Sequence, residues 1–176
     1  MGNEDLNLYT MELLGPVFEL LDKCKDVEQN KKWHPEGDVF IHSMQVFHYA
    51  IKETDDTDLI LAALLHDVGK QIDSKAHDMI ALDMLDDYCS SKTIWLIKEH
   101  MRIWYYLEGE MRRRSKCAKL VKHPWLMELI QLARWDKMGR REHFKPKYTY
   151  DDILDILNVK AIKHFGEKEE QTGCEQ

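Results

Sequence analysis

The sequence has no apolar run near the ~18 residues that a membrane span requires. Its four cysteines, Cys24, Cys89, Cys117 and Cys174, lie far apart without a CxxC pair, which excludes a zinc ribbon and any obvious disulfide framework. Positive charge is also in deficit: 25 Lys and Arg face 32 Asp and Glu, and the net charge of −7 argues against indiscriminate nucleic-acid binding. No basic segment followed by an apolar stretch opens the chain, so we expect a cytoplasmic protein that does not bind membranes.

Strand-like alternation is scarce, and apolar residues instead recur three and four positions apart along most of the chain. The expected helices cover 11–21, 39–51, 59–65, 79–88, 94–107, 126–138 and 153–162. At 176 residues with 44% hydrophobic content, the chain fits one domain with a real core. We therefore predict a single all-α bundle of about seven helices over residues 5–165, followed by a flexible acidic tail over 166–176.

Nine histidines are the unusual feature of the composition, because neutral imidazole is the commonest protein ligand for metals. Several acid or imidazole side chains lie on or beside apolar helical faces, where a polar group without a partner would be costly. They are His42, His66, Asp67, His77, His100 and Asp136.

Three of these positions show the argument best. Asp136 continues the apolar stripe of Leu129 and Ala133, so its carboxylate faces the interior. His66 and Asp67 directly end the apolar run 59–65, so a buried helix delivers two adjacent polar side chains to one place. The polar loop 54–58 can return the chain so that His42 lies beside them.

The order of these residues, together with Leu-Leu-His-Asp-Val-Gly-Lys at 64–70, resembles the HD superfamily of metal-dependent phosphohydrolases. The sequence motifs most resemble those of the HD domains of bacterial tRNA nucleotidyltransferases, through His-Pro-Glu-Gly-Asp-Val at 34–39 and Ala-Arg-Trp-Asp-Lys-Met-Gly-Arg at 133–140. No nucleotidyltransferase domain accompanies them, so nucleotide addition is not implied. Diadenosine-tetraphosphate hydrolases of the superfamily have the same order of histidines.

The resemblance implies a divalent metal held by His42, His66, Asp67 and Asp136. In binuclear members Asp67 would bridge to a second ion at positions matching His77 and His100, so one or two ions are expected. Mixed imidazole and carboxylate ligands suit Fe, Mn, Co, Ni or Zn without selecting one of them.

Further residues are candidates for catalysis and substrate binding. Lys70 either meets a phosphate or neutralises Asp67, and His34 and Glu36 either act in catalysis or cap a loop. Positive charge gathers at Arg112 and Arg113 within the acid-free segment 111–122, and again near Asp136. Arginine forks bind phosphate, so Arg112, Arg113, Lys137 and Arg140 are candidate substrate contacts, with a solvated basic face as the alternative for the arginine run.

The sequence therefore predicts a phosphohydrolase that uses metal-activated water on a phosphomonoester, phosphodiester or phosphoanhydride of a nucleotide-like substrate. A phosphorylated small molecule is the expected partner, and a nucleic-acid end is less favoured. Two alternatives stay open: a binuclear iron oxygenase, and a non-catalytic nucleotide-binding or regulatory module. The oligomeric state is not predicted.

Overall fold

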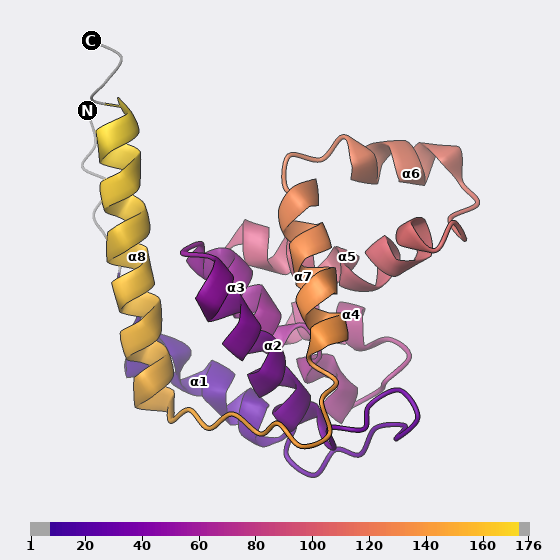
Figure 1. The fold of residues 1–176 in the computed structure, drawn as a ribbon, viewed down its shortest axis with the longest axis horizontal. Coiled ribbons are helices and arrows are strands. Elements are labelled where there is room, and N and C mark those ends of the chain that lie inside the picture. Colours follow the sequence, from indigo (N-terminus) through magenta and orange to yellow (C-terminus); the bar gives the residue numbers. More distant parts are fainter. Residues whose placement is uncertain (1–7, 173–176) are drawn as a thin grey trace.

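The computed structural model describes residues 8–172, with side chains through residue 166. Within that range the fold is all-α, as predicted (Figure 1). The elements are α1 (Met11–Asp22), α2 (Val39–Glu53), α3 (Thr57–Leu65), the 3-10 turn η1 (Val68–Gln71), α4 (His77–Leu85), α5 (Ser91–Leu107), α6 (Arg114–Val121), α7 (Leu126–Met138) and α8 (Tyr150–Thr172). Across the described residues, the only strand-type pairing is an isolated bridge between Glu28 and Asp38.

Side-chain caps define where several helices begin. Thr10, Asp38 and Ser90 each accept a hydrogen bond from the backbone N–H three residues further on, at the starts of α1, α2 and α5. Asp56 caps α3 in the same way. Such caps satisfy amides that have no partner inside the helix. The Asp38 cap matters for the site, because His42 lies in the first turns of the helix that it starts.

Helix α3 is the centre of the core. Every side chain from Leu59 to Leu65 is buried, because α2, α5 and α7 all pack against this helix. Helices α2 and α3 are joined by the short polar turn that the sequence indicated, and they lie side by side (Figure 1). A fully apolar helix thus delivers its last residues to the middle of the bundle.

Three elements differ from the prediction. Helix α6 was not predicted, because Leu120 is its only buried residue and no apolar stripe marks it. The helix predicted at 79–88 lies earlier, at 77–85, which places His77 in its first position. Helix α8 continues through Thr172, so residues 166–172 of the expected tail are helical; residues 173–176 lie outside the described range. None of the helices described between residues 8 and 172 is long and apolar enough to span a bilayer.

Candidate metal centre

The last residues of α3 begin the site. His66 caps the helix, and its ring Nδ1 lies 3.0 Å from the carbonyl oxygen of Ala63, one turn back. Asp67 follows with a non-helical backbone and leads into η1. Both side chains are buried. The end of the apolar helix therefore places an imidazole and a carboxylate side by side in the interior.

All four histidines of the predicted set share one geometry. Each Nδ1 lies against a backbone carbonyl oxygen: 2.9 Å for His42 and Gly139, 3.0 Å for His66 and Ala63, 2.8 Å for His77 and Ser74, and 2.5 Å for His100 and Ile97. A carbonyl oxygen only accepts, so each Nδ1 carries a proton, and whenever the ring is neutral its Nε2 keeps a lone pair. This is the tautomer that metal-binding histidines use when the second nitrogen is held by a carbonyl or carboxylate.

The Asp67 carboxylate lies between two pairs of these Nε2 atoms. Its Oδ2 is 3.6 Å from Nε2 of His42 and 3.6 Å from Nε2 of His66. Its Oδ1 is 3.2 Å from Nε2 of His77 and 3.7 Å from Nε2 of His100. Each oxygen thus faces a different pair of histidines.

The His77 and His100 pair requires a positive charge between them. Their Nε2 atoms are 3.1 Å apart, and both rings donate from Nδ1 to a carbonyl. Two nitrogen lone pairs cannot hydrogen-bond to each other, so a proton or a cation has to satisfy them. Nε2 of His66 is likewise buried without a hydrogen-bond partner among the described residues.

Asp136 adds a second carboxylate to the cluster formed by His42, His66 and Asp67. Its Oδ1 lies 3.1 Å from Nε2 of His42, and the indole Nε1–H of Trp104 donates to its Oδ2 at 3.2 Å. Arg140, one turn further along, reaches Oδ1 at 3.3 Å. The carboxylate is therefore held from two sides. The sequence analysis missed Trp104, because only the tertiary fold shows that α5 brings its indole to α7.

Burial and the neighbouring charges together set the protonation of these groups. Burial lowers the pKa of His66 to about 3, so its ring is neutral. Burial also disfavours a charged His42, but the carboxylates of Asp136 and Glu36 raise its pKa to about 9. Burial disfavours ionised Asp67, yet its neighbours His66, Lys70, His100 and His77 together hold its pKa well below the usual range. Buried carboxylates that stay ionised beside imidazoles form a site that attracts cations.

Glu36 and His34 lie on the outer side of His42. The Oε1 atom of Glu36 is 2.8 Å from Nδ1 of His42 and 2.9 Å from Nδ1 of His34. Glu36 is buried, and although burial opposes its ionisation, the hydrogen bonds from the two histidines bring its pKa to about 2. Glu36 therefore orients two rings and does not line the cavity, whereas His34 does.

An open cavity of about 590 Å³ lies over the centre. The residues that line it include Asp67, His77, His100 and Asp136, together with the predicted His34, Lys70, Lys137 and Arg140. Three aromatic side chains, Trp33, Trp104 and Tyr105, also line it. Lys70 is already paired, with its Nζ 2.6 Å from Oδ2 of Asp67 and 2.9 Å from Oε1 of Gln29.

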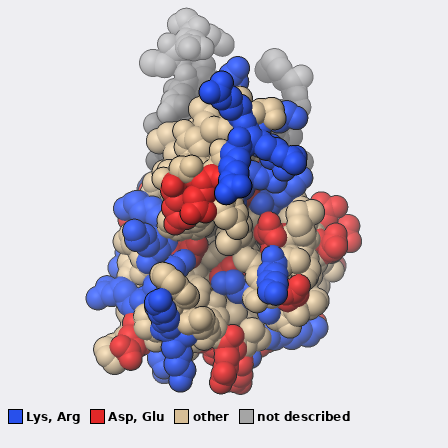
Figure 2. Space-filling view, turned by 90° about the vertical axis from the view of Figure 1, so that its right-hand side faces the viewer, with Lys and Arg blue, Asp and Glu red and all other residues tan. Residues whose placement is uncertain are grey.

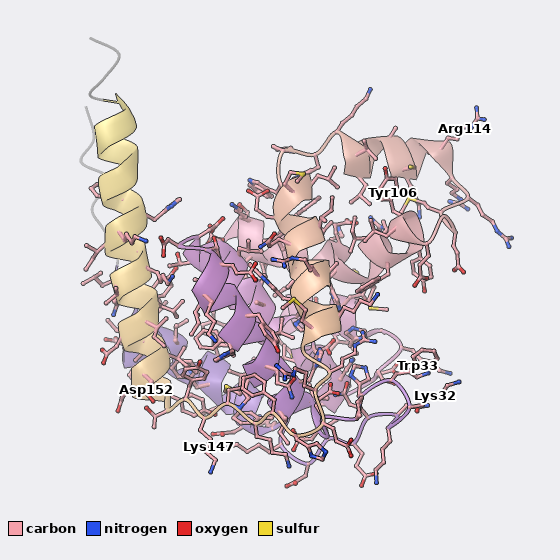
Figure 3. The ribbon with its side chains drawn as sticks, in the orientation of Figure 1. Lys32, Trp33, Tyr106, Arg114, Lys147 and Asp152 are labelled. Atoms are coloured by element: carbon pink, nitrogen blue, oxygen red, sulfur yellow. The ribbon has the colours of Figure 1, made fainter. Side chains whose placement is uncertain are left out.

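The arginine run lies elsewhere. Arg112 and Arg113 are exposed and do not line this cavity. The neighbouring Arg114 points away from the bundle, at the upper right of Figure 3, whereas Trp33 lies on the loop near the cavity. The structure thus brings Lys137 and Arg140 to the centre and leaves the arginine run outside it.

Two glycines allow the elements to approach this closely. A Cβ on Gly69 would lie 2.0 Å from the carbonyl oxygen of His77, where η1 packs against the start of α4. A Cβ on Gly139 would lie 2.6 Å from Cγ2 of Val46, and the carbonyl of Gly139 is the one that holds His42. Neither position has room for a side chain.

The family model for the HD domain matches residues 39–140 of this chain. The chain belongs to the HD-domain family. The matched range contains His42, the His66-Asp67 pair that gives the HD domain its name, and Asp136, and it excludes His34 and Glu36. HD domains are generally metal-dependent phosphohydrolases, and the clustered donors described above are compatible with divalent metal binding. The finer similarity to tRNA nucleotidyltransferases stays a prediction.

Proposed function

We propose that this HD domain is a phosphohydrolase with two divalent ions that cleaves a phosphate ester or anhydride of a nucleotide-like small molecule. The observation that carries the proposal is the position of Asp67, whose two oxygens face two separate pairs of Nε2 atoms. One carboxylate shared between two donor clusters is the arrangement that a pair of neighbouring ions needs.

The donors fit such ions. His42, His66, Asp67 and Asp136 would hold the first, and Asp67, His77 and His100 the second. Imidazole and carboxylate ligands suit Fe, Mn, Co, Ni or Zn. When bound, ions of this kind polarise a phosphoryl oxygen and lower the pKa of a coordinated water toward ~7.

The remaining residues of the cavity have roles in binding and proton transfer. Lys137 and Arg140 place positive charge where a phosphate would lie beside Asp136. His34 lines the cavity with its Nδ1 held by Glu36, so its imidazole is placed to accept or give a proton there. Trp33 and Tyr105 offer flat apolar surfaces for the organic part of the substrate.

The deciding experiment is metal analysis of protein purified without chelator, followed by a substrate screen. Nucleoside mono-, di- and triphosphates, cyclic nucleotides, dinucleoside polyphosphates and short RNA ends would be offered with several divalent ions. We expect metal-dependent release of phosphate or nucleotide. Substrate-dependent oxygen uptake would instead indicate an iron oxygenase, and saturable nucleotide binding without turnover in fully loaded protein would indicate a regulatory module.

Metal counting tests the two clusters separately. We expect His77→Ala or His100→Ala to lower the metal content from about two ions toward one, because each removes a donor of the second cluster only. His42→Ala should disturb the first ion. Anomalous scattering from crystals grown with excess metal locates the ions directly. A single peak distant from His77 and His100 would reject the binuclear assignment.

Arg140 tests substrate binding apart from metal binding. We expect Arg140→Ala to lower kcat/KM for phosphate substrates by about 10- to 100-fold at unchanged metal content, since a charged hydrogen bond is worth ~1.5–3 kcal/mol. Arg140→Lys should lose less. The neighbouring Arg141, which does not line the cavity, supplies the matched control Arg141→Ala. Unchanged efficiency with a lower Tm would make Arg140 a purely structural partner of Asp136.

A substitution of Trp104 tests whether its hydrogen bond to Asp136 strengthens metal binding. Trp104→Phe keeps the aromatic ring but removes the N–H that holds Oδ2 of Asp136. Removing such a partner costs ~10- to 100-fold in metal affinity, so titration against a competing chelator should show weaker binding. Tyr105→Phe, which also alters a residue of the cavity wall, should leave the affinity unchanged.

A further inference from the structure

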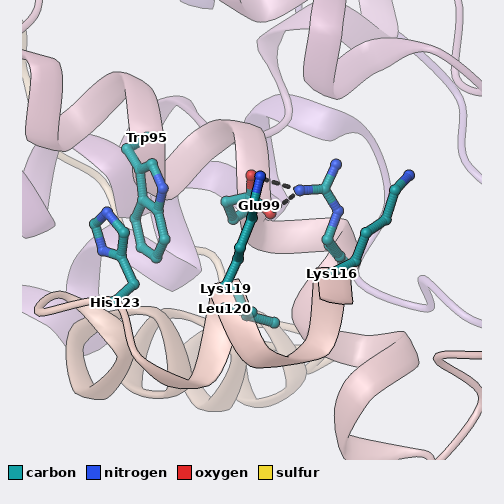
Figure 4. Close-up of a pocket in the computed structure, with 7 residues that line it drawn as sticks. Trp95, Glu99, Lys116, Lys119, Leu120 and His123 are labelled. Atoms are coloured by element: carbon teal, nitrogen blue, oxygen red, sulfur yellow. Dashed lines mark hydrogen bonds and ion pairs between the residues drawn. The ribbon is translucent and has the colours of Figure 1, made fainter. Parts of the chain in front are cut away.

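A second cavity lies on the far side of α5 from the metal centre. It has a volume of about 470 Å³ and is formed by α5, α6 and the turn after α6 (Figure 4). Helix α5 contributes Trp95, Glu99 and Arg102, spaced four and three residues apart on one face. The metal cavity uses the other face of this helix, through His100 and Trp104. The two cavities are therefore separate sites that share one wall.

The second cavity has a cationic end. Arg102, Lys116 and Lys119 line it, against the single carboxylate of Glu99. Glu99 is buried, and both of its oxygens accept from one nitrogen of Arg102, at 2.7 and 2.6 Å. The ammonium groups of Lys116 and Lys119 have no ion-pair partner among the described residues, and both side chains extend from α6 toward the side where Glu99 lies (Figure 4). Two positive charges without a carboxylate partner thus lie on exposed side chains that line the cavity.

The opposite end is aromatic. The rings of Trp95 and His123 are stacked, with centroids 3.7 Å apart and planes inclined by 11°. Leu120, the one buried residue of α6, lies beside them. Figure 4 shows this stack at one end of the cavity and Lys116 at the other. The cavity therefore separates an apolar wall from a cluster of cations.

Packing against the core does not explain the composition of α6. The helix buries only Leu120, yet it lies in the segment 111–122, which has six Lys or Arg and no acid in a protein of net charge −7. Figure 2 shows Lys and Arg gathered at the top of the face that it displays, the level at which Figure 1 shows α6. Unpaired like charges repel one another, so their concentration over a cavity favours an anionic ligand there.

We propose that the cavity between α5 and α6 binds a nucleoside monophosphate or an anion of similar build, at a site separate from the metal centre. The phosphate dianion would meet Lys116, Lys119 and the free edge of Arg102, and the organic part would lie against Trp95 and Leu120. The volume falls within the ~300–1,000 Å³ of ordinary ligand pockets. A cavity of this limited volume with one cationic end suits a compact ligand better than a nucleic-acid strand, which follows an extended groove. The inference does not depend on the proposed hydrolase activity.

Calorimetric titration of the full-length protein tests this site. The probe is adenosine 5′-monothiophosphate, a slowly hydrolysed nucleotide, with adenosine and inorganic phosphate as separate arms. We expect the double variant Lys116→Ala/Lys119→Ala to weaken nucleotide binding by about tenfold or more, because both unpaired cations are lost. The matched control Arg113→Ala/Arg114→Ala removes two charges from the same segment but outside the cavity, and should change the affinity less than about twofold. Asp67→Ala should retain the binding.

The outcomes separate the alternatives. Nucleotide binding that is tighter than that of adenosine and of inorganic phosphate, and sensitive only to the lysine pair, supports the site. Equal weakening by the two double variants would overturn it in favour of a diffuse basic surface. Binding that is lost in Asp67→Ala but kept in the lysine variant would assign the nucleotide to the metal centre instead. Tighter binding of a single-stranded oligonucleotide that depends on Arg113 and Arg114 would replace the small ligand by a nucleic acid.

Discussion

An Asp67→Ala protein is expected to bind neither ion and to lose at least about 10³-fold in turnover, or ~4 kcal/mol of transition-state stabilisation. The reason is that each oxygen of this one carboxylate faces a different pair of histidines, so its removal takes a donor from both clusters at once. Metal content, turnover and circular dichroism would be measured on the same samples. The helical signal should persist, because the core around α3 is apolar and does not include this side chain.

Asp83→Ala is the matched control. Asp83 is an exposed carboxylate on α4, outside the metal cavity, and its loss should leave both the metal content and the turnover unchanged. A folded Asp67→Ala protein with full metal content and turnover would refute the assignment of the centre.

Gly69→Ala is expected to damage the centre without touching a ligand. The added Cβ would lie 2.0 Å from the carbonyl oxygen of His77, and 2.8 Å from its carbonyl carbon and Cα. Backbone atoms cannot rotate away as a flexible side chain can, so η1 and the start of α4 have to separate. Overpacking of this kind costs ~1–3 kcal/mol, which corresponds to a fall in Tm of about 2–12 °C for a domain of this size.

The displacement should also lower the metal content toward one ion, because it moves His77 away from His100. Thermal melting with chelator and metal analysis without it measure the two effects separately. Gly166→Ala is a suitable control, since a Cβ there meets nothing within 4 Å and alanine favours a helix. An unchanged Tm and full metal content in Gly69→Ala would show that the approach of η1 to α4 can relax at no cost.

Burial leaves a clear pattern at some of the candidate positions, whereas their grouping as metal ligands was implied by the resemblance to the HD superfamily. An apolar run that ends in His66-Asp67, and a carboxylate at 136 on an apolar stripe, can be found from spacing alone. The structure then brings His42, His77 and His100 to the same place. It also places Arg140 beside Asp136, as its spacing of one helical turn indicated.

The features that the sequence did not predict depend on contacts between segments that are distant along the chain. Nothing in the spacing shows that Trp104 of α5 holds Asp136 of α7, or that Glu36 lies behind His42. Helix α6 escapes an apolar-periodicity search because its exposed face is cationic and it buries one side chain. The motif at 34–39 left Glu36 as either a catalytic residue or a loop cap, and in the structure its carboxylate accepts from His34 and His42.

The hydrogen bonds that orient the four histidines have a consequence for sequence variation. The Nδ1 partners are peptide carbonyls of residues 63, 74, 97 and 139, and for His66, His77 and His100 the carbonyl belongs to the residue three positions earlier. A substitution at position 63, 74 or 97 changes a side chain but keeps the carbonyl, so these three contacts depend little on which residue makes them, whereas Gly139 has no room for a side chain. Accumulated mutations in the neighbouring sequence would therefore remove the side-chain hydrogen bonds of Glu36 and Trp104 long before they could reorient an imidazole ring.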